Sequence, residues 1–135
     1  MYYVKFERLE SGAYTIVDHT DERLYLLGEL LLDDDIRGFV KTDLEDFPSI
    51  KENHPITFHT AQHSKITFER VQEDMLIIKL YNADRSHKIL QTDISIDELV
   101  NVVEDWEDLA YQEAPQIYVM RQHDKDIFIV SETRQ

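Results

Sequence analysis

The sequence predicts an α+β fold, with a curved, mostly antiparallel sheet of about eight strands, one long amphipathic helix packed on that sheet and one short helix. Short segments with alternating apolar and polar residues recur along the chain, whereas one long segment carries apolar residues at helical spacing. Because strands and helices do not alternate regularly, the pattern disfavours a parallel α/β arrangement. With 135 residues, the chain is expected to form a single domain over residues 1–135.

The long helix is predicted over residues 93–111. Ser95 is suited to the N-cap, and Glu98, three residues later, completes a capping box. The residues expected on its buried face are Ile96, Leu99, Val100, Val103, Trp106 and Ala110. The opposite face collects Asp97, Asn101, Glu104, Asp105 and Asp108. The surface that this helix presents to solvent is therefore almost purely acidic.

The remaining elements are predicted from alternation, turn residues and caps. A hairpin is expected at the N-terminus, with its turn at Ser11 and Gly12, and another at the C-terminus. The predicted strands cover residues 2–9, 13–17, 24–32, 56–60, 65–71, 75–81, 88–93, 116–121 and 127–131. We interpret Gly28 as a bulge within the strand at 24–32. The short helix begins with the aspartates at 33–35 and ends before Pro48.

The charge of the chain is strongly negative and unevenly distributed. The formal net charge is −14, and no Lys or Arg lies between Lys88 and Arg121. This interval holds the carboxylates of Asp93, Asp97, Glu98, Glu104, Asp105, Glu107, Asp108 and Glu113. Such a surface repels phosphate backbones and anionic membranes, so neither nucleic acid nor a membrane is expected as a partner. A basic protein partner is favoured, because complementary fields accelerate association.

Several of these carboxylates occupy an unfavourable part of the helix. Glu104, Asp105, Glu107 and Asp108 lie in its C-terminal half, where the helix dipole favours cations. Each misplaced exposed carboxylate costs about 0.3–1 kcal/mol, and the like charges of Glu104 and Asp108, four residues apart, add to this cost. Stability alone would favour some lysines here, which indicates that the charges serve binding.

Metal sites are not predicted. The chain has no cysteine, and His54, His59 and His63 lack the His-Glu-x-x-His pattern of zinc proteases. The aspartates at 33–35 resemble the start of a calcium loop, but Arg37 and Leu44 stand where oxygen ligands are required. Helix capping explains this acidic run better.

Catalytic motifs are also missing from the sequence. Three glycines cannot build a P-loop or a dinucleotide-binding loop, and no Gly-x-Ser-x-Gly occurs. The carboxylates of the long helix face solvent rather than a cleft. We therefore expect that the protein is not an enzyme and needs no cofactor.

These observations predict a non-catalytic acidic interaction protein that binds and masks a basic protein surface. The residues expected to contact the partner are Asp97, Asn101, Glu104, Asp105, Asp108, Tyr111, Glu113 and Tyr118. In composition the chain resembles the small acidic immunity proteins that neutralise bacterial toxins, often nucleases, and an immunity-type inhibitor is the first hypothesis. It also resembles phage proteins that mimic the charge of DNA to block a host defence enzyme.

A small-molecule-binding protein or an enzyme is a further alternative, with a site inside the curved sheet that uses His59, His63 and tyrosines. No segment resembles a signal peptide or reaches transmembrane length, so a cytoplasmic location is expected.

Overall fold

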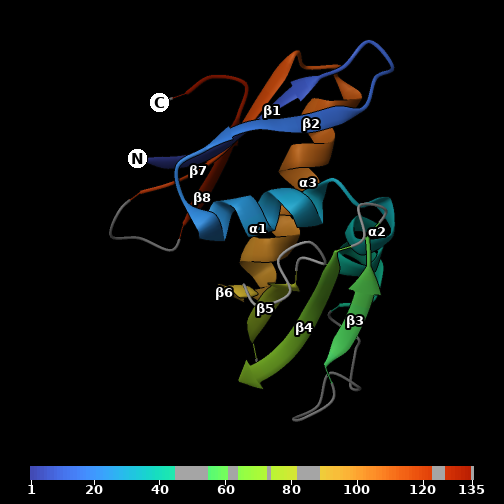
Figure 1. The fold of residues 1–135 in the computed structure, drawn as a ribbon, viewed down its shortest axis with the longest axis vertical. Coiled ribbons are helices and arrows are strands. Elements are labelled where there is room, and N and C mark those ends of the chain that lie inside the picture. Colours follow the sequence, from blue (N-terminus) through green and yellow to red (C-terminus); the bar gives the residue numbers. More distant parts are fainter. Residues whose placement is uncertain (45–54, 61–63, 73, 82–88, 123–126, 135) are drawn as a thin grey trace.

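The computed structural model describes residues 1–44, 55–60, 64–72, 74–81, 89–122 and 127–134. Within these residues the chain forms eight strands and three helices, which confirms the α+β class. The strands do not form the single sheet that the sequence predicted. They form two four-stranded antiparallel sheets, called here sheet A and sheet B (Figure 1).

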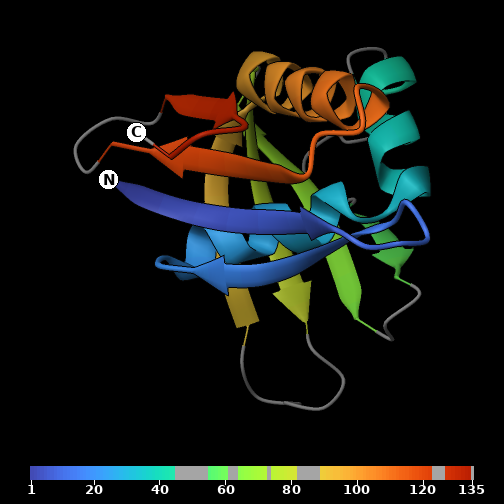
Figure 2. The ribbon, with the colours of Figure 1, turned by 90° about the horizontal axis from the view of Figure 1, so that it is seen from above.

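Sheet A joins the two ends of the chain in the order β2-β1-β7-β8, where β1 is Tyr2–Arg8, β2 Tyr14–His19, β7 Gln116–Arg121 and β8 Phe128–Ser131. Its centre is the pairing of β1 with β7, from Tyr2 opposite Arg121 to Glu7 opposite Gln116. Both predicted hairpins are therefore present, and they lie side by side (Figure 2).

Sheet B is a meander of the middle strands in the order β3-β4-β5-β6. These are β3 Ile56–His59, β4 Lys65–Gln72, β5 Met75–Tyr81 and β6 Ile89–Ser95. The helices are α1 Glu22–Leu31, α2 Asp34–Thr42 and α3 Ile96–Tyr111. Both α1 and α3 contact strands of the two sheets, and Figure 1 shows them between sheet A and sheet B. None of the helices in the described residues combines the length and hydrophobicity that a membrane-spanning helix requires.

The segment 24–32 is the main correction to the sequence-based prediction, because it forms helix α1 and not a bulged strand. Its buried leucines are Leu24, Leu26, Leu27, Leu30 and Leu31. At about 100° per residue these leucines lie within one arc of about 160°, but Gly28 and Glu29 are also buried and extend the buried surface to most of the helix circumference. The run therefore lacks the wide polar face that identifies an amphipathic helix. Gly28 marks a close helix–strand contact, since a Cβ added there would lie 2.8 Å from Cδ1 of Ile16 in β2.

Asp21 fixes the start of α1 in two ways. One carboxylate oxygen accepts a hydrogen bond from the backbone N–H of Arg23 at 2.8 Å, which caps the helix. The other accepts from Arg121 of β7 at 2.7 Å, and the two side chains are only 15% and 9% exposed. The pair therefore connects the N-terminus of α1 to the centre of sheet A.

Helix α2 confirms the capping interpretation of the acidic run. The side chain of Asp33 accepts from the backbone N–H of Ile36 at 3.0 Å. The helix ends at Thr42, earlier than the predicted end before Pro48. Pro48 itself lies outside the described residues.

Helix α3 docks through the face that its sequence predicts. Ile96, Leu99, Val103 and Trp106 are buried, whereas Val100 and Ala110 are half-buried. Ser95 is the N-cap and accepts from the backbone N–H of Glu98 at 3.1 Å. The carboxylate of Glu98 does not complete the expected capping box. It accepts from the backbone N–H of Phe128 at 2.8 Å and thereby ties α3 to β8.

Candidate functional site

The acidic face of α3 is defined here as Asp97, Asn101, Glu104, Asp105 and Asp108, all of which are exposed. Successive residues of a helix are separated by about 100° and about 1.5 Å, so these side chains form one stripe about 17 Å long. The opposite side of the helix is held by Val103 and Trp106, which are 0% and 3% exposed. The stripe therefore belongs to a helix whose buried face packs in the core and holds it in place.

The four carboxylates of this face have no cation among the residues that the structure describes. Within the described residues, none of them forms an ion pair or a side-chain hydrogen bond. Glu107, on the flank of the same helix, has two cations from α2: Arg37 at 3.1 Å and Lys41 at 2.6 Å. The bond to Glu107 raises the pKa of Lys41. Among the described residues, α2 neutralises the flank of α3, whereas the outer stripe has no ion pair.

The other predicted contact residues lie in different environments. Tyr111 is 83% exposed and continues the stripe at the end of α3. Glu113 is exposed and lies 3.7 Å from Arg8. Tyr118 is only 8% exposed and packs edge-to-face on Tyr3, with ring centroids 5.8 Å apart.

Tyr118 lies on the face of sheet A that points away from α3. Its neighbours Ile117 and Val119 belong to the main core, and side chains alternate along a strand, so Tyr118 faces the other way. The structure therefore brings Tyr111 beside the acidic face of α3 but does not bring Tyr118 there. Sequence proximity alone had suggested that they form one surface.

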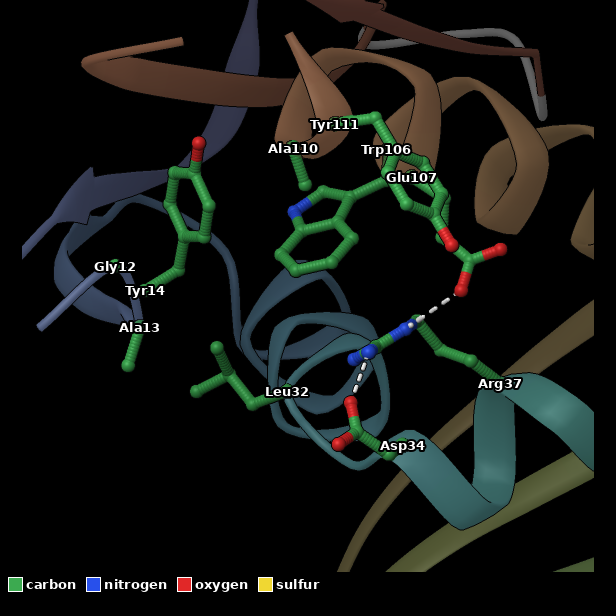
Figure 3. Close-up of a pocket in the computed structure, with 10 residues that line it drawn as sticks. All are labelled: Gly12, Ala13, Tyr14, Leu32, Asp34, Arg37, Trp106, Glu107, Ala110 and Tyr111. Carbon is green, nitrogen blue, oxygen red and sulfur yellow. Dashed lines mark hydrogen bonds and ion pairs between the residues drawn. The ribbon is translucent and has the colours of Figure 1, made fainter. Parts of the chain in front are cut away.

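A pocket of about 420 Å³ borders the stripe at the C-terminal end of α3. Figure 3 shows its walls: the β1–β2 turn on one side, the α1–α2 junction below, and the last turns of α3 above. The side chains that line it are Tyr14, Leu32, Asp34, Arg37, Trp106, Glu107, Ala110 and Tyr111, with Gly12 and Ala13 of the turn. Tyr111 and Glu107 belong both to this pocket and to the margin of the stripe.

The aromatic groups of the pocket are held firmly. Tyr14 and Trp106 pack edge-to-face with centroids 5.5 Å apart, and the hydroxyl of Tyr14 donates to the carbonyl of Ala114 at 2.7 Å. Burial raises the pKa of Tyr14. The guanidinium of Arg37 stacks over Trp106 at 4.9 Å. The indole Nε1 of Trp106 is buried without a hydrogen-bond acceptor in the described residues, and it lies on the side of the ring that faces Tyr14 and Ala110 (Figure 3).

Sequence reasoning did not find this pocket, because its walls come from four elements that are far apart in the chain. Arg37 was considered only as the residue that spoils a calcium loop. Arg37 contacts Asp34, the carbonyl of Leu31 and Glu107. These contacts connect the end of α1 and the start of α2 to α3. The ion pair with Asp34, three residues earlier, was the one signal of this role in the sequence.

The histidines considered for a metal site are not assembled by the described residues. His59 is exposed on β3, and His54 and His63 lie outside the part of the chain that the structure describes.

Comparisons of the chain with models of protein families, with curated proteins and with solved structures gave no match.

Proposed function

We propose that this chain is a non-catalytic interaction protein that binds and masks a basic protein surface with the acidic face of α3. The observation that carries the proposal is the contrast between Glu107 and its neighbours. Arg37 and Lys41 neutralise Glu107, whereas Asp97, Glu104, Asp105 and Asp108 have no cation in the described residues. Unpaired carboxylates on a rigid helix offer an electrostatic match for lysines and arginines of a partner.

The pocket beside Tyr111 supports a protein partner rather than a diffuse cloud of counterions. Interfaces concentrate binding energy in a few aromatic or arginine anchors that fill pockets, surrounded by a polar rim. Here an 83% exposed tyrosine and a pocket of about 420 Å³ adjoin the charged stripe. A partner side chain in this pocket would fix the register of the basic surface on the stripe.

Among acidic interaction proteins, an immunity-type inhibitor of a toxin or nuclease is our first choice. A nuclease binds phosphates with a basic cleft, and carboxylates can occupy that cleft without being cleaved. A phage mimic of DNA is the second choice. It is favoured by charge spacing, because the number of carboxylates on the stripe, four over about 17 Å, is close to the roughly five phosphates that one DNA strand carries over the same length. The aromatic pocket has no counterpart in a phosphate backbone, which favours the first choice.

The test reverses the charge of the acidic face by replacing Asp97, Glu104, Asp105 and Asp108 with Lys. The matched control makes the same change in net charge at exposed carboxylates outside α3, by replacing Glu10, Asp35, Asp43 and Glu132 with Lys. Each protein is used to capture a partner from extract of the native host. The purified partner is then used for association kinetics at two salt concentrations.

We expect the reversal on α3 to slow association about tenfold or more, whereas the control retains most of the wild-type rate. The wild-type rate should also fall as salt rises. Equal loss in the two variants would show that only net charge matters. Equal binding by wild type and the α3 variant would refute the proposed surface.

A further inference from the structure

A second opening lies between β2 and α1, and it shares no acidic residue with the face of α3. Its volume is about 490 Å³. It is lined by residues 15–19 of β2, by Tyr25 and Glu29 of α1, and by Leu32, which follows α1.

Glu29 is the unusual residue of this groove. Its side chain belongs to the few charged groups that are buried, with 9% exposure. Within the described residues its carboxylate forms no hydrogen bond and no ion pair. Its oxygens are not among the described side-chain atoms that are sealed from solvent without a hydrogen-bond partner, so the carboxylate opens into the groove, where a cation can reach it and form a charge-assisted hydrogen bond.

The other carboxylate of the groove is already occupied. Asp18 accepts the hydroxyl of Tyr3 at 2.6 Å on one oxygen and the backbone N–H of His19 at 2.9 Å on the other. Glu29 is therefore the free acceptor for a ligand. At the end of the groove, His19 and Tyr25 pack with ring centroids 4.7 Å apart and provide an aromatic wall, a surface that suits the stem and charge of an organic cation.

The shape of β2 favours a single inserted group over an added strand. The pairing of β2 with β1 skips Val17, so a bulge interrupts this edge of sheet A beside the groove. Bulges of this kind oppose strand addition at a sheet edge. A narrow cation on an alkyl stem fits beside the bulge without needing a regular row of backbone donors and acceptors.

We propose that the groove between β2 and α1 binds a protonated primary alkylamine, with the ammonium group on the carboxylate of Glu29 and the stem along Tyr25 and Val17. The same chemistry is offered by a free amine and by a lysine side chain of a protein. This inference does not depend on the acidic face of α3.

The test is a titration of the isotope-labelled protein followed by amide chemical shifts, with three probes. Pentylamine carries the proposed charge, 1-pentanol has the same stem without it, and Nα-acetyl-lysine methylamide presents a lysine side chain. We expect saturable shifts in β2 and α1 with the amines and none with the alcohol. Tighter binding of pentylamine would identify a free amine as the ligand type, and tighter binding of the lysine derivative would identify a protein side chain.

Glu29→Gln keeps the shape of the side chain and removes its charge, so it should weaken amine binding about tenfold or more. Glu132→Gln removes the same charge from an exposed position after β8, at the opposite edge of sheet A from β2, and should leave amine binding unchanged. Urea unfolding checks that both variants are folded. The proposal is overturned if the alcohol binds as well as the amine, if no probe saturates, or if Glu29→Gln binds amines as wild type does.

Discussion

The hydroxyl of Tyr3 and the carboxylate of Asp18 form a hydrogen bond of 2.6 Å between β1 and β2. This bond lowers the pKa of Asp18 and raises the pKa of Tyr3. The lowered pKa of Asp18 means that the bond contributes stability above the unfolded pKa of about 4 and loses it as pH falls through the folded pKa. The raised pKa of Tyr3 means that the contribution is lost again as pH rises through the folded pKa, above about 10.

Tyr3→Phe should therefore destabilise the protein near neutral pH and have progressively less effect in acid. The measurement is the difference in unfolding free energy between wild type and variant, from urea titrations at about pH 7 and at about pH 2–3. Tyr14→Phe is the control, because its hydroxyl donates to a backbone carbonyl that does not titrate. A Tyr3→Phe effect as large in acid as at neutral pH would show that Asp18 is not the titrating partner.

At the scale of single elements, the two helical glycines provide a matched pair. A Cβ at Gly38 would meet no atom within 4 Å, whereas one at Gly28 would lie 2.8 Å from Cδ1 of Ile16 and 3.1 Å from Cγ2 of Val4. Alanine is favoured over glycine within a helix by roughly 0.5–1 kcal/mol. Gly38→Ala should therefore gain about this amount, and crowding at Gly28→Ala should cancel the gain.

Urea unfolding of the two single variants measures this difference. Equal gains at the two positions would mean that α1 does not approach β1 and β2 as closely as the structure places it. The result bears on α1 directly, because this helix is the element that the sequence did not reveal.

The success of the prediction for α3 and its failure for α1 have a common physical reason. Helix α3 is amphipathic and has a serine cap, so its spacing and its start are visible in the sequence. Helix α1 lies between the two sheets and is buried on several sides, so its apolar run could equally be a buried strand. The acidic face of α3 followed from the correctly predicted helix. The groove at Glu29 could not be predicted, because its helical wall was interpreted as a strand.

At the scale of the whole molecule, the division into two sheets depends on contacts between distant residues. Each hairpin is visible locally, but nothing near Tyr2 indicates that it pairs with Arg121. The ion pair of half-buried Asp21 with buried Arg121 closes the same long-range contact, and its residues are individually unremarkable in the sequence. Eight of the nine predicted strands and their antiparallel direction were therefore predictable, whereas the helix at 24–32 and the assignment of strands to sheets were not.

The two sheets share one core, and α3 is part of the layer that joins them. Val103 is 0% exposed in this core, together with Leu99 of α3, Phe6 of sheet A and Ile78 of sheet B. A charge at this position has no partner and would be removed from water. Val103→Asp should therefore lower the unfolding free energy by about 3–5 kcal/mol, a loss that affects both sheets at once.

Val71→Asp is the matched control, because Val71 is 43% exposed at the end of β4 and the same replacement there should cost only about 0.5 kcal/mol. Urea titrations followed by tryptophan fluorescence and by far-ultraviolet circular dichroism report on the surroundings of Trp106 and on the secondary structure as a whole. If α3 joins the sheets, the two signals of Val103→Asp should shift together to a lower midpoint. A shift in fluorescence with unchanged dichroism would mean that the packing around Trp106 can be lost while the secondary structure persists. Equal midpoints for the two variants would show that Val103 is not a core residue.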